Sequence, residues 1–275
     1  YSSAASDVYK RQGEIVKRFI YADNAATTKL DSDALNEMLP WLQDEYGNAS
    51  QPYTFARKPR KALSEARTTI ASCIGAQPEE IYFTSGGTES DNWAIKGAAH
   101  LGAKKGKKHI ITSKFEHHAV LHTLDSLKKE GFEVTYLDVH ENGIVRPEEL
   151  ENAIREDTAL VTIMFANNEI GTIQPVKEIG EICKKHKVIF HTDAVQAVGA
   201  IPVDVREIGC DLLSMSAHKF HGPKGVGAIF MRKGLRLPNL IDGGAQESGS
   251  RAGTENIAGI VGMSVALKHS CEIMA

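Results

Sequence analysis

Lys219 is the first residue of this sequence whose surroundings suggest chemistry. It follows a short apolar segment, 212–215, within the stretch Ser216-Ala217-His218-Lys219. A lysine at the end of a buried strand loses solvation, which lowers its pKa and makes the neutral amine a nucleophile for carbonyl groups. The glycine-rich stretch 221–227 is expected to fix the loop behind it. The alternative is a surface or salt-bridged lysine.

The loop Ser85-Gly86-Gly87-Thr88-Glu89-Ser90 is a second candidate. Glycines allow the chain to turn tightly, and the helix that follows offers free N–H groups and a positive dipole end. Gly87 and Thr88 are therefore predicted to bind an anion, most often a phosphate. The alternative is an ordinary turn in which Thr88 caps the helix. The loop is neither a Walker motif nor a Rossmann fingerprint.

Three further polar residues could act beside the lysine. Asp193 follows an apolar segment, and a buried carboxylate there needs a partner. A pyridinium nitrogen is one such partner, whereas an arginine or a helix N-cap is the alternative. Gln196 would face the same way if a helical turn starts at Asp193. His117 opens a predicted helix, where it could stack on a flat ring or make a hydrogen bond at the helix end.

These groups together describe the needs of one cofactor. Pyridoxal phosphate (PLP) requires a lysine to hold it covalently, an acidic partner for its ring nitrogen and an anchored phosphate. We therefore expect PLP in this protein, and we expect no metal site.

The elements that must position these residues follow an alternating pattern. Short apolar strands alternate with helices, which is typical of an α/β domain with a mostly parallel, buried sheet. In such sheets ligands sit at the carboxyl ends of the strands, and five of the predicted strands end in polar groups that would converge on one rim. Strands are predicted at 81–84, 109–112, 132–139, 160–165, 188–192, 212–215 and 227–231, and helices at 32–45, 56–74, 89–100, 117–130, 147–155 and 176–186 and from 255 onward.

The sequence resembles the cysteine desulfurases of the NifS/IscS type, which are class V aminotransferase-like enzymes of PLP fold-type I. The resemblance runs from about residue 20 to the end of the sequence, and its specificity lies in the order and spacing of several motifs. These are YADNAATT at 21–28, FTSGGTESDN at 83–92, EHHAV at 116–120, NNEIG at 167–171, HTDAVQ at 191–196, SAHK at 216–219 and RAGT at 251–254.

The resemblance implies a role for each matching residue. Lys219 would hold PLP and then move the substrate Cα proton, while His117 would stack on the ring and act as a catalytic residue by shuttling a proton. Asp193 would pair with the ring nitrogen, Gln196 would bond the phenolic oxygen, and Asn168 would touch that oxygen or the substrate carboxylate. The residues implied in phosphate binding are Thr88, Ser216 and His218, with Thr254 reaching the phosphate of the neighbouring subunit in a homodimer.

The resemblance also implies a domain organisation. A leader or artefact at 1–13 precedes an N-terminal segment at 14–32, a PLP-binding large domain of the aspartate aminotransferase-like fold at 33–254, and the start of a smaller domain at 255–275. The family's sulfur-accepting cysteine and substrate-carboxylate arginine lie in a later part, so we expect a C-terminally truncated piece without them. None of the four cysteines in this sequence matches that thiol. They are Cys73, Cys183, Cys210 and Cys271.

The implied reaction removes sulfur from L-cysteine, leaving L-alanine and an enzyme persulfide. The implied partner is a sulfur acceptor such as an iron–sulfur scaffold protein. A selenocysteine lyase or another class V enzyme is an alternative, although the NNEIG stretch favours the desulfurases and selenocysteine lyases. A non-catalytic PLP-fold fragment or binding module is the alternative of another class.

Composition narrows the remaining possibilities. The 275 residues are 42% hydrophobic and 24% charged with a net charge of −3, which is typical of a globular protein and argues against a dedicated nucleic-acid binder. No apolar run approaches about 18 residues, so we expect no membrane span. The four cysteines form no CxxC pair, which argues against a zinc site or a disulfide framework and favours a cytoplasmic protein.

Overall fold

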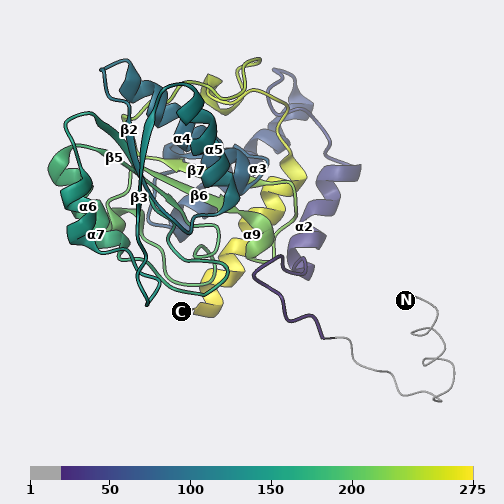
Figure 1. The fold of residues 1–275 in the computed structure, drawn as a ribbon. Helices are drawn as coiled ribbons and strands as arrows, with labels where there is room; N and C mark the ends of the chain where they lie inside the picture. Colours follow the sequence, from purple (N-terminus) through teal and green to yellow (C-terminus); the bar gives the residue numbers. More distant parts are fainter. Residues whose placement is uncertain (1–19, 275) are drawn as a thin grey trace, which may run out of the picture.

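A single seven-stranded sheet organises the computed structural model, which describes residues 20–274 (Figure 1). The strand order is β1-β7-β6-β5-β4-β2-β3. Only β7 runs antiparallel to its neighbours within this sheet, so the carboxyl ends of the other six strands share one edge. The predicted α/β class with a mostly parallel sheet is confirmed. The strands are β1 Ile81–Thr84, β2 His109–Ser113, β3 Glu133–Leu137, β4 Thr158–Thr162, β5 Ile189–Asp193, β6 Leu212–Ser216 and β7 Gly227–Met231.

Helices cover both faces of the sheet. Successive residues of a strand point to opposite faces, so Leu212 packs with one set of helices and Leu213 with the other. The first face is covered by α4 and α5, and the second by α3, α7 and α9. Burial on both faces explains why the strands are apolar throughout. The helices are α2 Ser32–Gln43, α3 Arg57–Cys73, α4 Gly87–Ala103, α5 His118–Lys129, α6 Pro147–Ala153, α7 Val176–His186, α8 Val205–Ile208 and α9 Ile257–Met274.

Most predicted elements lie within a few residues of the observed ones, and among the strands β4 differs most. The sequence predicts this strand at 160–165, whereas the structure places it at Thr158–Thr162. The apolar run continues past the strand because Ile163 and Phe165 stay in the core after the regular pairing ends. Apolar runs report burial, and burial here extends further than the strand.

Helix α9 corrects the premise that no apolar run approaches the length of a membrane span, but it does not overturn the expectation of no span. Its 18 residues are long and apolar enough to cross a membrane, by length and composition alone. However, 61% of that window is buried, and Ile260, Met263 and Leu267 belong to the main core. A core helix passes the same test, so this is weak evidence for a membrane span. The helix packs on α2 and α3, and the predicted domain boundary at residue 255 stays a prediction.

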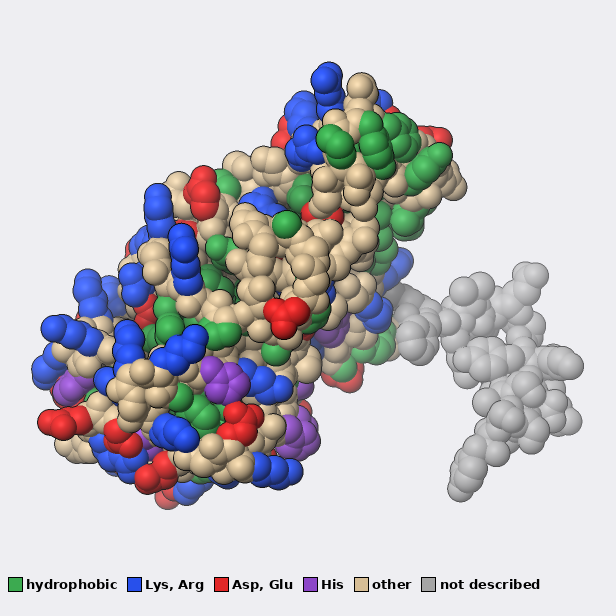
Figure 2. Space-filling view, turned by 90° about the horizontal axis from the view of Figure 1, so that it is seen from above, with side chains coloured by type: hydrophobic (Ala, Val, Ile, Leu, Met, Phe, Trp, Pro, Cys, Tyr) green, Lys and Arg blue, Asp and Glu red, His purple; other side chains and the backbone are tan. Residues whose placement is uncertain are grey.

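The surface mixes charges of both signs. On the face shown in Figure 2, lysine and arginine side chains are interspersed with acidic ones, while hydrophobic side chains gather at one protruding corner. Exposed large apolar residues include Leu35, Leu39 and Leu42 of α2, and Tyr46 and Phe55 after it. The leader predicted at 1–13 lies outside the described residues.

Candidate active site

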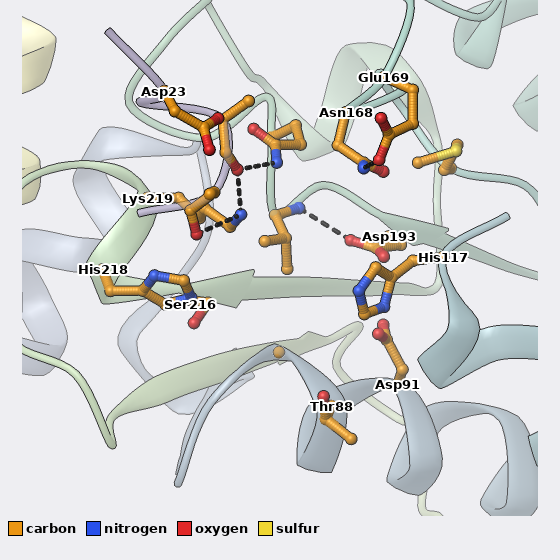
Figure 3. Close-up of a pocket in the computed structure, with 16 residues that line it drawn as sticks. Asp23, Thr88, Asp91, His117, Asn168, Glu169, Asp193, Ser216, His218 and Lys219 are labelled. Carbon is orange, nitrogen blue, oxygen red and sulfur yellow. Dashed lines mark hydrogen bonds between the residues drawn. The ribbon is translucent and has the colours of Figure 1, made fainter. Parts of the chain in front are cut away.

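A cavity of about 460 Å³ opens at the shared carboxyl edge of the parallel strands (Figure 3). It lies where the loops after β1, β4, β5 and β6 meet, together with the residues before α5 and the segment around Ala25. Every predicted site residue except Thr254 lines it, so the expected convergence on one rim is confirmed geometrically. These residues are Gly87, Thr88, His117, Asn168, Asp193, Gln196, Ser216, His218 and Lys219.

Lys219 is half-buried at the end of a single 3₁₀ turn, Ala217–Lys219, that follows β6. Its Nζ donates to the backbone carbonyls of Ala25 and Ala26, the second at 3.1 Å, and it makes no salt bridge among the described residues. Burial lowers the pKa of Lys219, although the negative charges of Asp193 and Asp23 partly offset this. The alternative of a surface or salt-bridged lysine is therefore wrong.

Asp193 is the last residue of β5 and is only 5% exposed. Its Oδ1 accepts a hydrogen bond of 2.9 Å from the N–H of Val195. Burial raises the pKa of Asp193, whereas that N–H and the positive charges of His117 and Lys219 act in the opposite direction. Within the described chain no arginine pairs with this carboxyl, which leaves it facing the cavity.

His117 makes the helix-end hydrogen bond that was one of its two predicted roles, and stacking on a flat ring stays a prediction. It is the N-cap of α5, and its Nδ1 accepts a hydrogen bond of 3.1 Å from the N–H of Ala119. The ring nevertheless lines the cavity, between Asp193 and Asp91 in Figure 3. Because Nδ1 is an acceptor, the proton of the neutral ring lies on Nε2.

The loop predicted to bind a phosphate has the expected position, but the residue that caps the helix is a different one. Gly86, with a φ of 147°, is the N-cap of α4, and Thr88 lies inside the first turn. A second hollow of about 480 Å³ shares Gly87, Thr88, Ser216 and His218 with the main cavity and adds Lys224. The first N–H groups of a helix have no intrahelical acceptor, so this end of the cavity suits an anion.

The close packing at this loop requires glycine. A Cβ added to Gly87 would lie 2.7 Å from Cγ2 of Val195, so a side chain there would push into the wall of the cavity. Glu89, which also borders the hollow, is neutralised by two hydrogen bonds of 2.7 and 2.9 Å from Arg251. The net charge facing an anion is therefore favourable.

The two predicted amides make local bonds at the mouth of the cavity. Gln196 donates through Nε2 to the carbonyl of Ala25 at 2.9 Å. Asn168 donates to Oε1 of Glu169 at 2.6 Å. Thr254 is exposed and outside the cavity, so its predicted contact with a neighbouring subunit stays a prediction.

Comparison with known proteins places this site in a family. The model of the class-V aminotransferases matches residues 20–275. The chain belongs to this family. It is 55% identical over 255 residues to the cysteine desulfurase IscS of Clostridium botulinum, covering 93% of this chain and 64% of that protein. It is also 55% identical over 259 residues to IscS of Methanosarcina thermophila, with the same coverage.

Solved structures agree with this class-V assignment. A NifS-like protein superposes with a TM-score of 0.91 at 44% identity, covering 94% of this chain and 71% of that one. A structure described as SspA in complex with cysteine has a TM-score of 0.89 at 43% identity and covers 91% and 73%. The chain spans about 64% of the length of the curated relatives it matches.

Sequence reasoning missed part of this class-V site. Asp91 and Met164 line the cavity, as do Asp23 and Glu169. Asp91 had a signal, because it follows Thr88 by three residues on the same helix and so lies on the same face. The other three sit in irregular segments, where no periodicity indicates which way a side chain points.

None of the four cysteines lines this cavity. Burial raises the pKa of Cys73 to about 12, and it also raises the pKa values of Cys183, Cys210 and Cys271. A thiol reacts as its thiolate, so none of these is an activated nucleophile. The expectation that none of them is the sulfur-accepting cysteine agrees with this geometry.

Proposed function

We propose that this chain is the PLP-binding part of a cysteine desulfurase, an enzyme that removes sulfur from L-cysteine and leaves L-alanine. The observation that carries the proposal is the position of Lys219. Its amine forms no ion pair with any described residue and lies in one cavity with Asp193 and His117. The similarity to proteins named cysteine desulfurase, and to SspA in complex with cysteine, supports this choice of substrate.

The residues present fit PLP. One oxygen of the buried Asp91 has no hydrogen-bond partner, and Lys219 is held only by two backbone carbonyls. The second hollow, which would take the phosphate, is lined by Thr88 and His218 but not by the buried carboxyls Asp91 and Asp193. When bound, PLP supplies an electron sink that stabilises negative charge on the substrate Cα.

Lys219 and Asp193 would make the contacts on which the reaction depends. The lowered pKa of Lys219 keeps a larger share of its amine neutral, so Nζ can first hold the cofactor and later take the proton from the substrate Cα. Asp193 would pair with the ring nitrogen. Asp193 is only 5% exposed, and a hydrogen bond to its carboxylate is stronger in these surroundings of low polarity than it would be in water.

The remaining side chains would orient the cofactor ring and the substrate, and would anchor the phosphate. His117 would lie against the ring, and its Nε2 proton faces the cavity rather than the helix. Thr88, Ser216 and His218 would bind the phosphate. Gln196 and Asn168, now engaged with Ala25 and Glu169, would turn to the phenolic oxygen and the substrate carboxylate.

We also propose the wider setting that the resemblance implies. The sulfur would pass to an acceptor such as an iron–sulfur scaffold protein. The enzyme would be a cytoplasmic homodimer in which Thr254 reaches the phosphate of the neighbouring subunit. These proposals rest on the likeness to the desulfurases named above.

The test begins with the cofactor. PLP added to the purified protein should give a visible absorption band, and borohydride should fix the label on the peptide that contains Lys219. Lys219→Ala should abolish both, whereas Lys224→Ala should keep the covalent label. A colourless protein, or a label on another lysine, would contradict the proposal and favour a non-catalytic module. The complete gene product should then release sulfide from L-cysteine, and Lys219→Ala should stop it.

A further inference from the structure

Asp91 is a buried carboxyl of the cavity to which the proposed function assigns no role. It lies on α4 one turn after Thr88 and is only 1% exposed. Its Oδ1 is fully buried and has no hydrogen-bond partner. In Figure 3 it points from α4 toward His117 and Asp193, into the floor of the cavity. An unpaired polar atom at such a depth is costly unless it has a function.

A second buried carboxyl lies beside it. One ring nitrogen of His117 and one carboxylate oxygen from each of Asp91 and Asp193 all lie within 4.8 Å of one another. Two ionised carboxylates at this separation repel each other strongly in a buried site, so the pair is expected to keep one proton. Glu116, also buried, adds a further negative charge to this region when ionised.

Among residues 20–274, no lysine or arginine forms an ion pair with Asp91. The nearest ionisable nitrogen is Nε2 of His191, 3.7 Å from Oδ1. Both nitrogens of that ring are engaged, with Thr162 at 2.8 Å and Ser214 at 3.0 Å. Burial also lowers the pKa of His191 to about 3, so this imidazole is neutral and cannot balance a carboxylate.

The two carboxyls differ in a way that decides which one keeps the proton. Asp193 receives the N–H of Val195 and faces the positive charges of His117 and Lys219. Oδ1 of Asp91 accepts no hydrogen bond within the described residues, and burial together with the charge of Asp193 raises the pKa of Asp91 well above the ordinary value, although Ser214 acts in the opposite direction. The ionised form is therefore more favourable at Asp193.

We propose that Asp91 is a positioning residue that carries the proton of a buried carboxylic acid–carboxylate pair with Asp193. As a neutral acid it limits the pair to one negative charge. That charge then resides on Asp193, where a cofactor ring nitrogen would meet it. This last step rests on the proposed function, whereas the shared proton belongs to the chain itself.

The test is a pH titration of the aspartate carboxyl carbons by NMR, on cofactor-free protein labelled only at aspartate. Labelling only aspartate removes the overlapping signal of Glu116. In the native protein one aspartate should titrate far above the ordinary range. Asp91→Asn should remove that titration and move the titration of Asp193 to lower pH. The reciprocal variant Asp193→Asn should move the titration of Asp91 to lower pH.

The control is Asp125→Asn, an exposed residue of α5 whose loss should leave the high titration unchanged. The proposal is overturned if the high titration survives in Asp91→Asn, or if Asp193 titrates identically with and without Asp91. Asp91→Ser, a smaller neutral replacement, should repeat the result if the asparagine variant folds poorly.

PLP binding separates this inference from the proposed function. Asp91→Asn, which keeps the pair at one charge, should bind PLP within about twofold of the native protein, whereas Asp193→Asn should bind at least about tenfold more weakly. Failure of the native protein to bind PLP would contradict the proposed function alone. A tenfold loss in Asp91→Asn would contradict the assignment of a neutral Asp91.

Discussion

Glu116 shows how one buried side chain can make the stability of this protein depend on pH. It is 4% exposed and lies three residues after the end of β2, just before His117. Its carboxyl accepts hydrogen bonds from Ser113 and from the N–H of Met164 at 3.0 Å. Burial nevertheless dominates and raises the pKa of Glu116 to about 8. The folded protein therefore holds a proton at neutral pH that the unfolded chain has released.

This proton predicts the direction of the pH dependence. Glu116 is protonated in both states below about pH 4.5, so it has no effect there. Between about pH 5 and 8 only the unfolded state ionises, and this contribution to the free energy of unfolding falls as the pH rises. Glu116→Gln removes the titration. The variant should therefore gain on the native protein by up to about 4 kcal/mol across this range.

Urea unfolding at pH 5, 6, 7 and 8 measures this gain. The comparison between pH values cancels any constant cost of fitting an amide against the N–H of Met164. Glu65→Gln, at an exposed position of α3, should run parallel to the native protein. Parallel curves for Glu116→Gln as well would show that Glu116 is ionised in the folded state.

At the scale of an element, Asp31 joins the start of α2 to α9. Its Oδ1 accepts from the N–H groups of Asp33 and Ala34 at 2.8 and 2.9 Å, which caps α2. Its Oδ2 lies 3.0 Å from Nδ1 of His269 on α9. One side chain therefore fixes where α2 begins and ties it to the helix on which it packs.

Two substitutions separate these contributions. Asp31→Ala removes the cap and the tie, and should lower the free energy of unfolding by about 1 kcal/mol. Asp31→Asn keeps a capping oxygen, so it should lose clearly less than the alanine variant when both are measured in urea at pH 7. Equal losses in the two variants would mean that the contact with His269, and not the cap, is what stabilises this end of α2.

The elements also show what could be predicted from the sequence and why. Apolar runs located all seven strands, because strands buried on both faces cannot be polar. The reversed direction of β7 has no such signal, since a buried strand reads the same in either direction. The site residues were predictable where a motif follows a strand. Asp91 was missed although it lies one helical turn after Thr88, because an aspartate within a helix is usually exposed to solvent, whereas this one is buried.

At the scale of the molecule, the site exists only in the folded chain. Lys219 and Gln196 both bond to Ala25, and Thr28 donates to the carbonyl of His218 at 2.9 Å, so the two distant parts of the sequence close on each other at the cavity. A ligand of this site therefore binds the native state and has no counterpart in the unfolded chain. Such a ligand stabilises the fold by mass action.

This linkage predicts the effect of adding or removing the cofactor. PLP at about 100 times its dissociation constant should raise the free energy of unfolding by about 2.7 kcal/mol. For a chain of this size that corresponds to a Tm increase of about 5–10 °C by differential scanning calorimetry. Pyridoxal without phosphate should give a smaller increase at the same concentration, because it leaves the hollow near Thr88 and His218 empty. Lys219→Ala should also respond less, because only non-covalent contacts remain. Equal increases for PLP in Lys219→Ala and the native protein would place the cofactor away from Lys219.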